Sequence, residues 1–241
     1  MKILLNGGGS APELELTMKK LDEIIDHSNP ILYIPLAMDE NNIPYDSCYE
    51  WFGSLLTNIN VEYEMVRTFE ELVEIDFNSY SAIFIGGGNT YKLLKGLKDN
   101  NIFTNIKKFI ENDGVVVGCS AGAVICGRDI DIIEEMDPND VNLKDTVGFD
   151  VMDGISIFPH YINLKSRLSE EENKARIDKY TKSMLDFSLT KGDVIAIPEE
   201  DTIYINGSMI EIIGNKTYYI VTNGKMESYD PEFITTISRK L

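Results

Sequence analysis

The sequence has few cysteines and few histidines among its 241 residues. The three cysteines, Cys48, Cys119 and Cys126, are odd in number and lack the spacing of a metal site. They therefore exclude a disulfide framework and favour a reducing compartment. The two histidines, His27 and His160, are the only candidates for any chemistry that a histidine performs.

Basic residues are also scarce. The chain has 22 Lys and Arg against 40 Asp and Glu, a formal net charge of −18. Proteins that bind nucleic acid or anionic membranes neutralise phosphates with their own Lys and Arg, so this balance argues against both partners. An acidic exterior is more often a solubilising one, and the charge alone identifies no partner.

Long apolar runs are missing as well. No window approaches the roughly 18 uninterrupted apolar residues of a membrane-spanning helix. The first residues, Met1–Leu5, resemble a strand rather than the basic start and cleavage site of a signal peptide. We therefore expect a cytoplasmic protein. The sequence shows no metal-ligand cluster and no cofactor motif, so we expect neither a metal nor a cofactor.

Short apolar runs alternate with amphipathic stretches along most of the chain. Strands are predicted at Ile3–Leu5, Ile31–Leu36, Val61–Val66, Ala82–Ile85, Val115–Val117 and Ile155–Phe158, and helices at Glu13–Ile25, Tyr45–Leu56, Thr90–Asp99, Phe103–Asn112 and Glu170–Phe187. This alternation predicts the α/β class, a mostly parallel sheet flanked by helices on both faces. Short strands after residue 193 predict a C-terminal antiparallel extension at one sheet edge. No stretch resembles a linker, so residues 1–241 are predicted to form a single domain.

Two glycine loops follow predicted strands, and they differ in how well they suit a binding site. Gly7–Gly9 is an incomplete dinucleotide loop, because Pro12 replaces its third glycine and an acidic helix start would repel a pyrophosphate. We interpret it as a tight turn. Gly86–Gly88 leaves backbone N–H groups exposed, which suits an oxyanion or a carboxylate, although a structural turn is an equal alternative.

A third loop, Gly118–Gly122, has the pattern Gly-x-Ser-x-Gly between a predicted strand and a predicted helix. This is the nucleophile elbow, a turn so tight that small residues must flank the serine, and it exposes the hydroxyl of Ser120. The N–H of Ala121 faces the same site at the start of the helix and can receive a developing oxyanion. The pattern predicts that Ser120 is a nucleophile.

A serine nucleophile needs a base, usually a histidine held by a carboxylate. His160 follows the strand predicted at Ile155–Phe158. If this strand runs parallel to the one before Ser120, the two residues lie at the same edge of the sheet. His27 is best interpreted as a favourable charge at a helix end. The residues alone leave the carboxylate open, because the segment from 128 to 149 contains many acids.

Four motifs together identify a resemblance: Ile85–Thr90, Gly118–Ala123, Phe158–Tyr161 and Ile197–Glu199. Over nearly its whole length the chain resembles the serine peptidase family that contains dipeptidase E (α-aspartyl dipeptidase) and, more distantly, cyanophycinase. The resemblance implies a fold like class I glutamine amidotransferase domains. It also implies hydrolysis of short peptides, a dipeptidase-like exopeptidase activity, through an acyl-enzyme.

The resemblance also implies roles for individual residues. Ser120 would be the nucleophile, His160 the general base, and the N–H groups of Gly88 and Ala121 the oxyanion hole. The triad acid would be Glu135, with Glu134 as the alternative.

Substrate binding is expected at Asn89, Asn173 and Arg176. Dipeptidase E is similar in having, in the helix after the histidine, an arginine that pairs with a substrate aspartate, and Asn173 takes that position here. An amide does not replace a bidentate guanidinium–carboxylate pair, so strict aspartyl specificity is doubtful unless Arg167 or Arg176 takes over.

Two other functions compete with a peptidase. One is a non-catalytic ligand-binding domain on the same scaffold. The other is a glutamine amidotransferase that uses Cys119, which fails because Cys119 precedes the elbow centre and its side chain should point away. We expect a short peptide as the partner, no nucleic acid and no membrane, and a monomer or homodimer.

Overall fold

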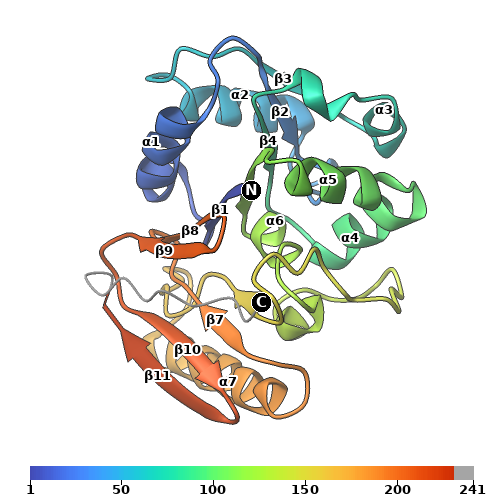
Figure 1. The fold of residues 1–241 in the computed structure, drawn as a ribbon. Coiled ribbons are helices and arrows are strands. Elements are labelled where there is room, and N and C mark those ends of the chain that lie inside the picture. The colour runs from blue at the N-terminus through green and yellow to red at the C-terminus, as the bar shows by residue number, and fades with distance from the viewer. Residues whose placement is uncertain (231–241) are drawn as a thin grey trace.

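The computed structural model describes residues 1–230, and residues 231–241 of the predicted domain lie outside this part (Figure 1). The described chain forms a seven-stranded sheet in the order β3-β2-β4-β5-β1-β8-β9. Its strands are β1 (Lys2–Asn6), β2 (Ile31–Ile34), β3 (Tyr63–Met65), β4 (Ala82–Ile85), β5 (Val115–Cys119), β8 (Thr202–Asn206) and β9 (Met209–Ile213). The first five are parallel to one another, β8 is antiparallel to β1, and β9 is antiparallel to β8.

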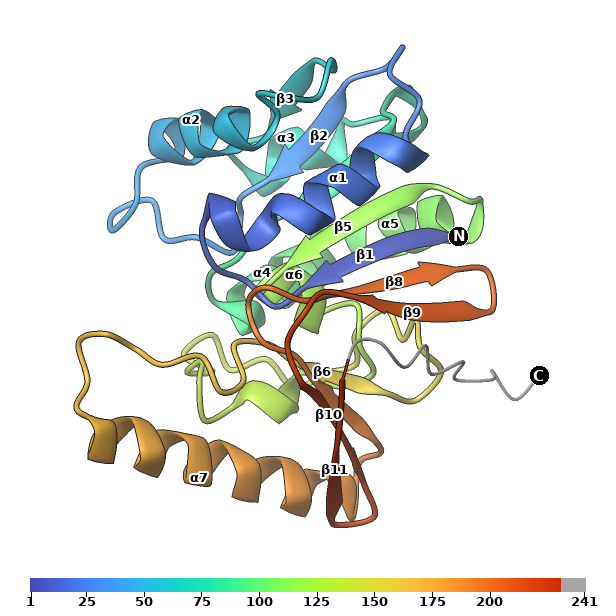
Figure 2. The ribbon, with the colours of Figure 1, turned by 90° about the vertical axis from the view of Figure 1, so that its left-hand side faces the viewer.

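Helices cover both faces of this sheet (Figures 1 and 2). One face carries α1 (Glu15–Ile24) and α2 (Tyr45–Leu55), and the other carries α3 (Phe69–Val73), α4 (Thr90–Asp99), α5 (Ile102–Glu111) and α6 (Ala121–Val124). Because both faces are covered, β2, β4 and β5 are buried along their whole length and consist largely of aliphatic residues. The predicted α/β class with a mostly parallel sheet is confirmed.

A second sheet, in the order β11-β10-β7-β6, lies beside the first with the long helix α7 (Glu170–Ser188) against it (Figure 2). It contains β6 (Ser156–Phe158), β7 (Val194–Ala196), β10 (Tyr218–Thr222) and β11 (Lys225–Tyr229). The strands after residue 193 are therefore divided between the two sheets. Only β8 and β9 form the predicted antiparallel extension of the main sheet, and β7, β10 and β11 belong to the second sheet. The strand predicted at Ile155–Phe158 belongs to the second sheet, where it pairs in parallel with β7.

Short elements complete the described chain. The 3₁₀ turns are η1 (Ala11–Leu14), η2 (Phe77–Ser79) and η3 (Ile130–Ile133). The last of these lies in the acid-rich segment from 128 to 149, where its three isoleucines are buried. No helix in residues 1–230 is long and apolar enough to cross a membrane.

The strand register brings the three glycine loops together. Leu5 of β1 and Ile85 of β4 both pair with Gly118 of β5, so the three strands end side by side. In parallel sheets the carboxyl ends of neighbouring strands share one rim, and ligand sites form there. The loops that follow β1, β4 and β5 therefore meet at a single place.

Candidate active site

Ser120 lies in the sharp turn between β5 and α6, with φ 53° and ψ −112°. This strained conformation is typical of a nucleophile elbow and is held by the surrounding packing. A Cβ atom on Gly118 would lie 2.4 Å from the carbonyl oxygen of Gly122, and one on Gly122 would lie 2.1 Å from that of Ile85. The two flanking glycines are therefore required sterically.

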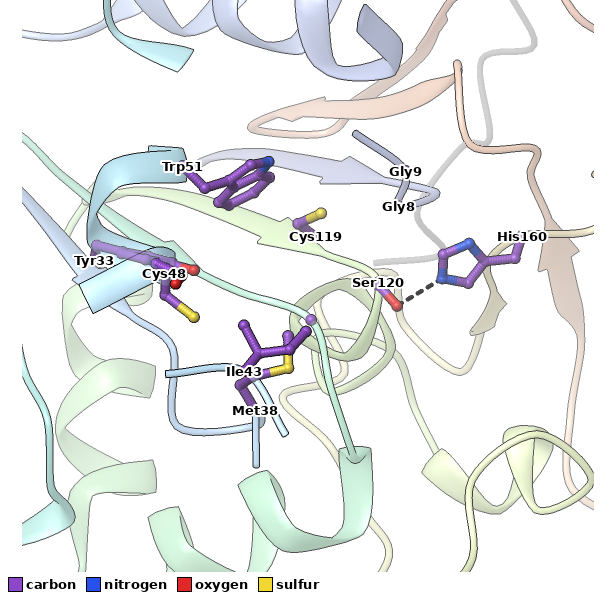
Figure 3. A pocket seen from close by; sticks show the side chains of 12 residues that line it. Gly8, Gly9, Tyr33, Met38, Ile43, Cys48, Trp51, Cys119, Ser120 and His160 are labelled. Carbon is purple, nitrogen blue, oxygen red and sulfur yellow. Dashed lines mark hydrogen bonds between the residues drawn. The ribbon is translucent and has the colours of Figure 1, made fainter. Parts of the chain in front are cut away.

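Ser120, His160 and Glu199 form a chain of hydrogen bonds. Ser120 Oγ lies 2.8 Å from His160 Nε2, and His160 Nδ1 lies 2.7 Å from Glu199 Oε1. The His160 and Glu199 side chains are both 17% exposed, so bulk water screens their interaction only weakly. Figure 3 shows the imidazole directed at the serine hydroxyl.

Glu199 is charged over the whole physiological pH range. The hydrogen bond from His160, supported by a second one from Lys165 Nζ at 3.1 Å, lowers the pKa of Glu199 to about 2. The loop that carries this residue is fixed on both sides. Its N–H donates to Asn163 Oδ1 (2.8 Å), and its carbonyl oxygen accepts from Asn6 Nδ2 (3.1 Å).

The structure does not bring the expected acid, Glu135, to His160. Glu135 is instead ion-paired at the surface with Lys179 of α7. The alternative, Glu134, is exposed just after η3. The segment around Glu134 and Glu135 is held away from His160 by two contacts. Asp137 accepts hydrogen bonds from Thr90 at the start of α4, and Lys191, just after α7, pairs with Asp129 and Asp131. The carboxylate in contact with His160 is that of Glu199.

A sequence signal for Glu199 was present. It ends the motif Ile197–Glu199, directly after the buried strand β7. Because β7 pairs in parallel with β6, and His160 follows β6, the loops after these two strands lie together. The sequence did not show that β6 and β7 are neighbours.

The two residues expected to form the oxyanion hole, Gly88 and Ala121, adjoin the site: Ala121 follows Ser120, and Gly87, just before Gly88, lines the same cavity as Ser120. Gly88 has φ +137°, and a Cβ atom there would lie 2.2 Å from the carbonyl oxygen of Ala37, so this position requires glycine. The N–H of Ala121 begins α6 next to the hydroxyl of Ser120. Within residues 1–230 neither N–H takes part in a backbone hydrogen bond, so both are free to bind an oxygen.

The glycine loop after β1, interpreted above as a simple turn, also forms part of the site. A Cβ atom on Gly8 would lie 2.1 Å from His160 Cε1, and Gly8 has φ +111°. The N–H of His160 donates to the carbonyl oxygen of Gly7 (3.1 Å). This loop therefore seats the imidazole ring.

Asn6, at the end of β1, connects these parts and was not singled out from the sequence. Its side chain is fully buried. Its Oδ1 accepts from Gly8 N–H (2.8 Å), while its Nδ2 donates to the carbonyl oxygen of Glu199 and to Thr202 Oγ1 (3.3 Å). One amide thus fixes both the loop under His160 and the loop that carries its carboxylate.

The three expected substrate-binding residues are occupied by contacts within the chain. Asn89 caps α4 by accepting from Lys92 N–H (2.8 Å), and its Nδ2 donates to the carbonyl oxygen of Pro138 (2.9 Å). Asn173 is buried and binds backbone groups of residues 165–169. Arg176 donates to the carbonyl oxygen of Asn163. It therefore supports a residue that binds Glu199.

The remaining candidates lie outside the hydrogen-bonded chain. His27 is at the surface beyond α1 and binds Asp22 (2.7 Å). Cys119 is buried, its Sγ faces Asn6 Oδ1 at 3.8 Å, and burial raises the pKa of its thiol to about 12. Figure 3 shows this thiol apart from the hydrogen-bonded Ser120 and His160, but Cys119 lines the same cavity as they do, against the expectation that its side chain points away from the site.

A serine at a nucleophile elbow, next to a histidine held by a carboxylate at the rim of an α/β sheet, is the arrangement of the serine hydrolases. A model of peptidase family S51 matches residues 3–213. The chain belongs to this family, and it is a peptidase.

Relatives and solved structures agree with this assignment. The chain is 25% identical over 224 residues to peptidase E of Shewanella denitrificans, covering 91% of this chain and 88% of that protein. It is 29% identical over 210 residues to peptidase E of Nostoc sp., covering 83% and 79%. The crystal structure of a peptidase from an acI-B1 Actinobacterium is similar in fold, with a TM-score of 0.66, 19% identity, and coverage of 98% and 96%.

Proposed function

We propose that the chain hydrolyses short peptides through an acyl-enzyme formed on Ser120. The observation that supports this most strongly is the continuous hydrogen-bonded chain from Ser120 through His160 to Glu199. We assign the acid role to Glu199, in place of the expected Glu135. The strained turn at Ser120 and the free N–H groups beside it support the same chemistry.

In the first half of the reaction, Ser120 Oγ attacks the peptide carbonyl carbon while His160 Nε2 takes the hydroxyl proton. The carbonyl oxygen becomes an oxyanion and accepts hydrogen bonds from the N–H groups of Gly88 and Ala121. Glu199 fixes the imidazole tautomer and stabilises the imidazolium. His160 then gives its proton to the leaving amine as the C–N bond breaks.

In the second half, water hydrolyses the ester on Ser120. His160 accepts a proton from this water as its oxygen attacks the acyl carbon. The same oxyanion hole stabilises the second tetrahedral intermediate. His160 then returns the proton to Ser120 Oγ, and the acid product leaves.

The test is a dipeptide and tripeptide library assayed with the wild type and Ser120→Ala. We expect the variant to lose about 10⁴-fold or more in kcat/KM, because the nucleophile is removed. Its circular dichroism should be unchanged. Ser208→Ala, a change at an exposed serine in the turn after β8, is the matched control and should keep full activity.

Labelling separates this function from a non-catalytic ligand-binding domain. A serine-directed phosphonate should modify the wild type and Ser208→Ala with one equivalent each, and Ser120→Ala not at all. Undiminished hydrolysis by Ser120→Ala, or no labelling of the wild type, would refute the proposal.

A further inference from the structure

A cavity of about 370 Å³ opens beside Ser120. Its far wall is built from Tyr33 at the end of β2, from Met38 and Ile43 in the loop before α2, and from Cys48 and Trp51 of α2. Ser120 and His160 close its other end together with the glycine loops (Figure 3). Its volume is in the range of small-ligand pockets.

Among residues 1–230, no lysine or arginine side chain lines the cavity wall. Charged side chains near the cavity lie at its rim: Lys92 Nζ donates to the carbonyl oxygen of Met38 (3.0 Å), and Glu40 helps raise the pKa of the Cys48 thiol after the larger effect of burial. Moving a carboxylate from water into such surroundings is unfavourable, because nothing replaces its hydration. An apolar side chain gains free energy in the same place.

The wall is held in shape by aromatic packing. The ring of Tyr33 stacks on Phe52 at 4.4 Å and lies 6.2 Å from Trp51. Phe84 of β4 contacts the same cluster, 6.3 Å from Trp51. Offset and edge-on contacts of this kind fix ring orientation, so the cavity exists before a ligand enters.

The position of His160 determines which part of a peptide faces the cavity. At the tetrahedral intermediate, the oxygen points to Gly88 and Ala121, and the leaving nitrogen points to His160 Nε2, which protonates it. The acyl side must therefore extend away from His160. Figure 3 places Tyr33, Met38 and Trp51 on the far side of Ser120 from His160.

We propose that this cavity selects peptides whose acyl-side residue, the one whose carbonyl Ser120 attacks, has an apolar side chain such as leucine, methionine or phenylalanine. This inference rests on the proposed function and names its substrate class. It also gives a physical reason for a departure from aspartyl peptides: within residues 1–230 no lysine or arginine side chain lines the cavity, and Asn173 is used to hold residues 165–169.

The first test is a set of dipeptides X-Ala in which only the acyl-side residue X changes. We expect kcat/KM for X = Leu, Met or Phe to exceed that for Asp by about tenfold to a hundredfold, since one poorly fitting group in a pocket costs one to two orders of magnitude. A parallel set Ala-X should show a weaker dependence. A preference for Asp-Ala, or selectivity confined to the Ala-X set, would overturn the inference and leave the proposed function standing.

The second test places a cation in the cavity wall. Ile43→Arg should lower the Leu-Ala to Asp-Ala ratio of kcat/KM at least tenfold, and Ile43→Met should preserve the order of preference. Ile43 is 43% exposed, so the fold tolerates the change. Met209→Arg, at an apolar residue of similar exposure (39%) on β9, is the charge-matched control and should leave the ratio within twofold. Equal ratios in both arginine variants would refute the assignment of the cavity.

The third test needs no turnover. Trp51 is the single tryptophan of the sequence and lines the cavity, so its fluorescence reports ligand binding. In Ser120→Ala, Leu-Ala should change the emission and bind at least tenfold more tightly than Asp-Ala. Such binding without any hydrolysis by the wild type would support the cavity assignment while refuting the proposed function. Tighter binding of Asp-Ala would refute the cavity assignment.

Discussion

The acidic segments 129–145 and 199–201 place their carboxylates in different surroundings, and only the second brings one to His160. In the first, the carboxylates mostly meet lysines at or near the surface, as in the pairs of Glu135 with Lys179 and of Asp145 with Lys98. In the second, Glu199 is 17% exposed and Asp201 is fully buried. The number of acids in a segment therefore says little about which acid is used for chemistry.

Glu199 and Asp201, two of the three carboxylates in the short segment, also differ from each other. Glu199 has hydrogen bonds from His160 and Lys165, and its pKa falls to about 2. Asp201 accepts two backbone N–H groups at Oδ1, but its buried Oδ2 has no hydrogen-bond partner in residues 1–230. Desolvation raises the pKa of Asp201 to about 7. Partners therefore decide the sign of the shift, since both side chains are withdrawn from solvent.

The largest expected effect is on catalysis. Glu199→Gln should lower kcat/KM by about 10⁴-fold, because an amide no longer enforces the imidazole tautomer or stabilises the imidazolium. Glu135→Gln is the matched control and should stay within about twofold of the wild type. Steady-state kinetics on one dipeptide measures both. A larger loss in Glu135→Gln than in Glu199→Gln would reverse the assignment of the acid.

The second largest effect is that of Asp201→Asn on the free energy of unfolding, and it is largest at high pH. The folded state of Asp201 retains its proton up to a pKa of about 7, whereas the usual value is 3.8, so stability falls as the pH rises through this window. Asp201→Asn removes the titration. The variant should gain up to about 4 kcal/mol over the wild type between pH 4 and pH 8, from roughly 3 pH units at about 1.4 kcal/mol each. Urea unfolding at both pH values measures this, and a pH-independent difference contradicts it.

The third effect is the contribution of Glu199 to the free energy of unfolding, which depends on pH in the opposite direction from that of Asp201. Glu199 has a folded-state pKa of about 2 against the usual 4.5, so its contribution is present above pH 4.5 and is lost as the pH falls towards 2. The stability advantage of the wild type over Glu199→Gln should be on the order of 3 kcal/mol at pH 7. It should shrink steadily below pH 4.5 in acid-unfolding experiments. A gap that widens in acid would be inconsistent with this pKa.

The smallest effect concerns the first segment. Asp137 accepts from the N–H (2.8 Å) and the hydroxyl (2.7 Å) of Thr90 at the start of α4. Asp137→Ala should therefore destabilise the fold by about 1 kcal/mol, the usual value of a lost helix cap. Thermal unfolding measures this, and the loss of activity should be far smaller than in Glu199→Gln. A loss comparable to that of Glu199→Gln would give this segment a role in catalysis.

The sequence predicted the local features of the site well. The elbow at Ser120 depends on five consecutive residues, and the exposed N–H groups depend on a short run of glycines, so neither requires knowledge of distant contacts. The parallel sheet was likewise visible, because strands buried on both faces are continuous apolar runs. The sequence paired Ser120 with His160 as nucleophile and base; the structure places Ser120 Oγ 2.8 Å from His160 Nε2, and the catalytic roles of the two residues stay predictions.

The partner of His160 depended on pairing that the sequence does not display. Glu199 reaches it because β7 pairs with β6 in a second sheet, while β8 returns to pair with β1 in the first. A short buried strand does not specify which sheet it joins, since many pairings satisfy the same apolar pattern. The roles of Asn6 and Gly8 were missed for the same reason, since both depend on contacts distant in sequence.

The amide of Asn6 has a consequence for the synthesis of this enzyme. It binds Thr202, which lies 196 positions further along the chain, and the carbonyl oxygen of Glu199 in the same turn. A nascent chain that has been made only as far as β6 contains Ser120. It does not yet contain Glu199 or strand β8, which carries Thr202. Asn6 must wait for Thr202 before the proposed catalytic groups are aligned, so we expect peptide-cleaving activity to be withheld until the chain has been made beyond Thr202.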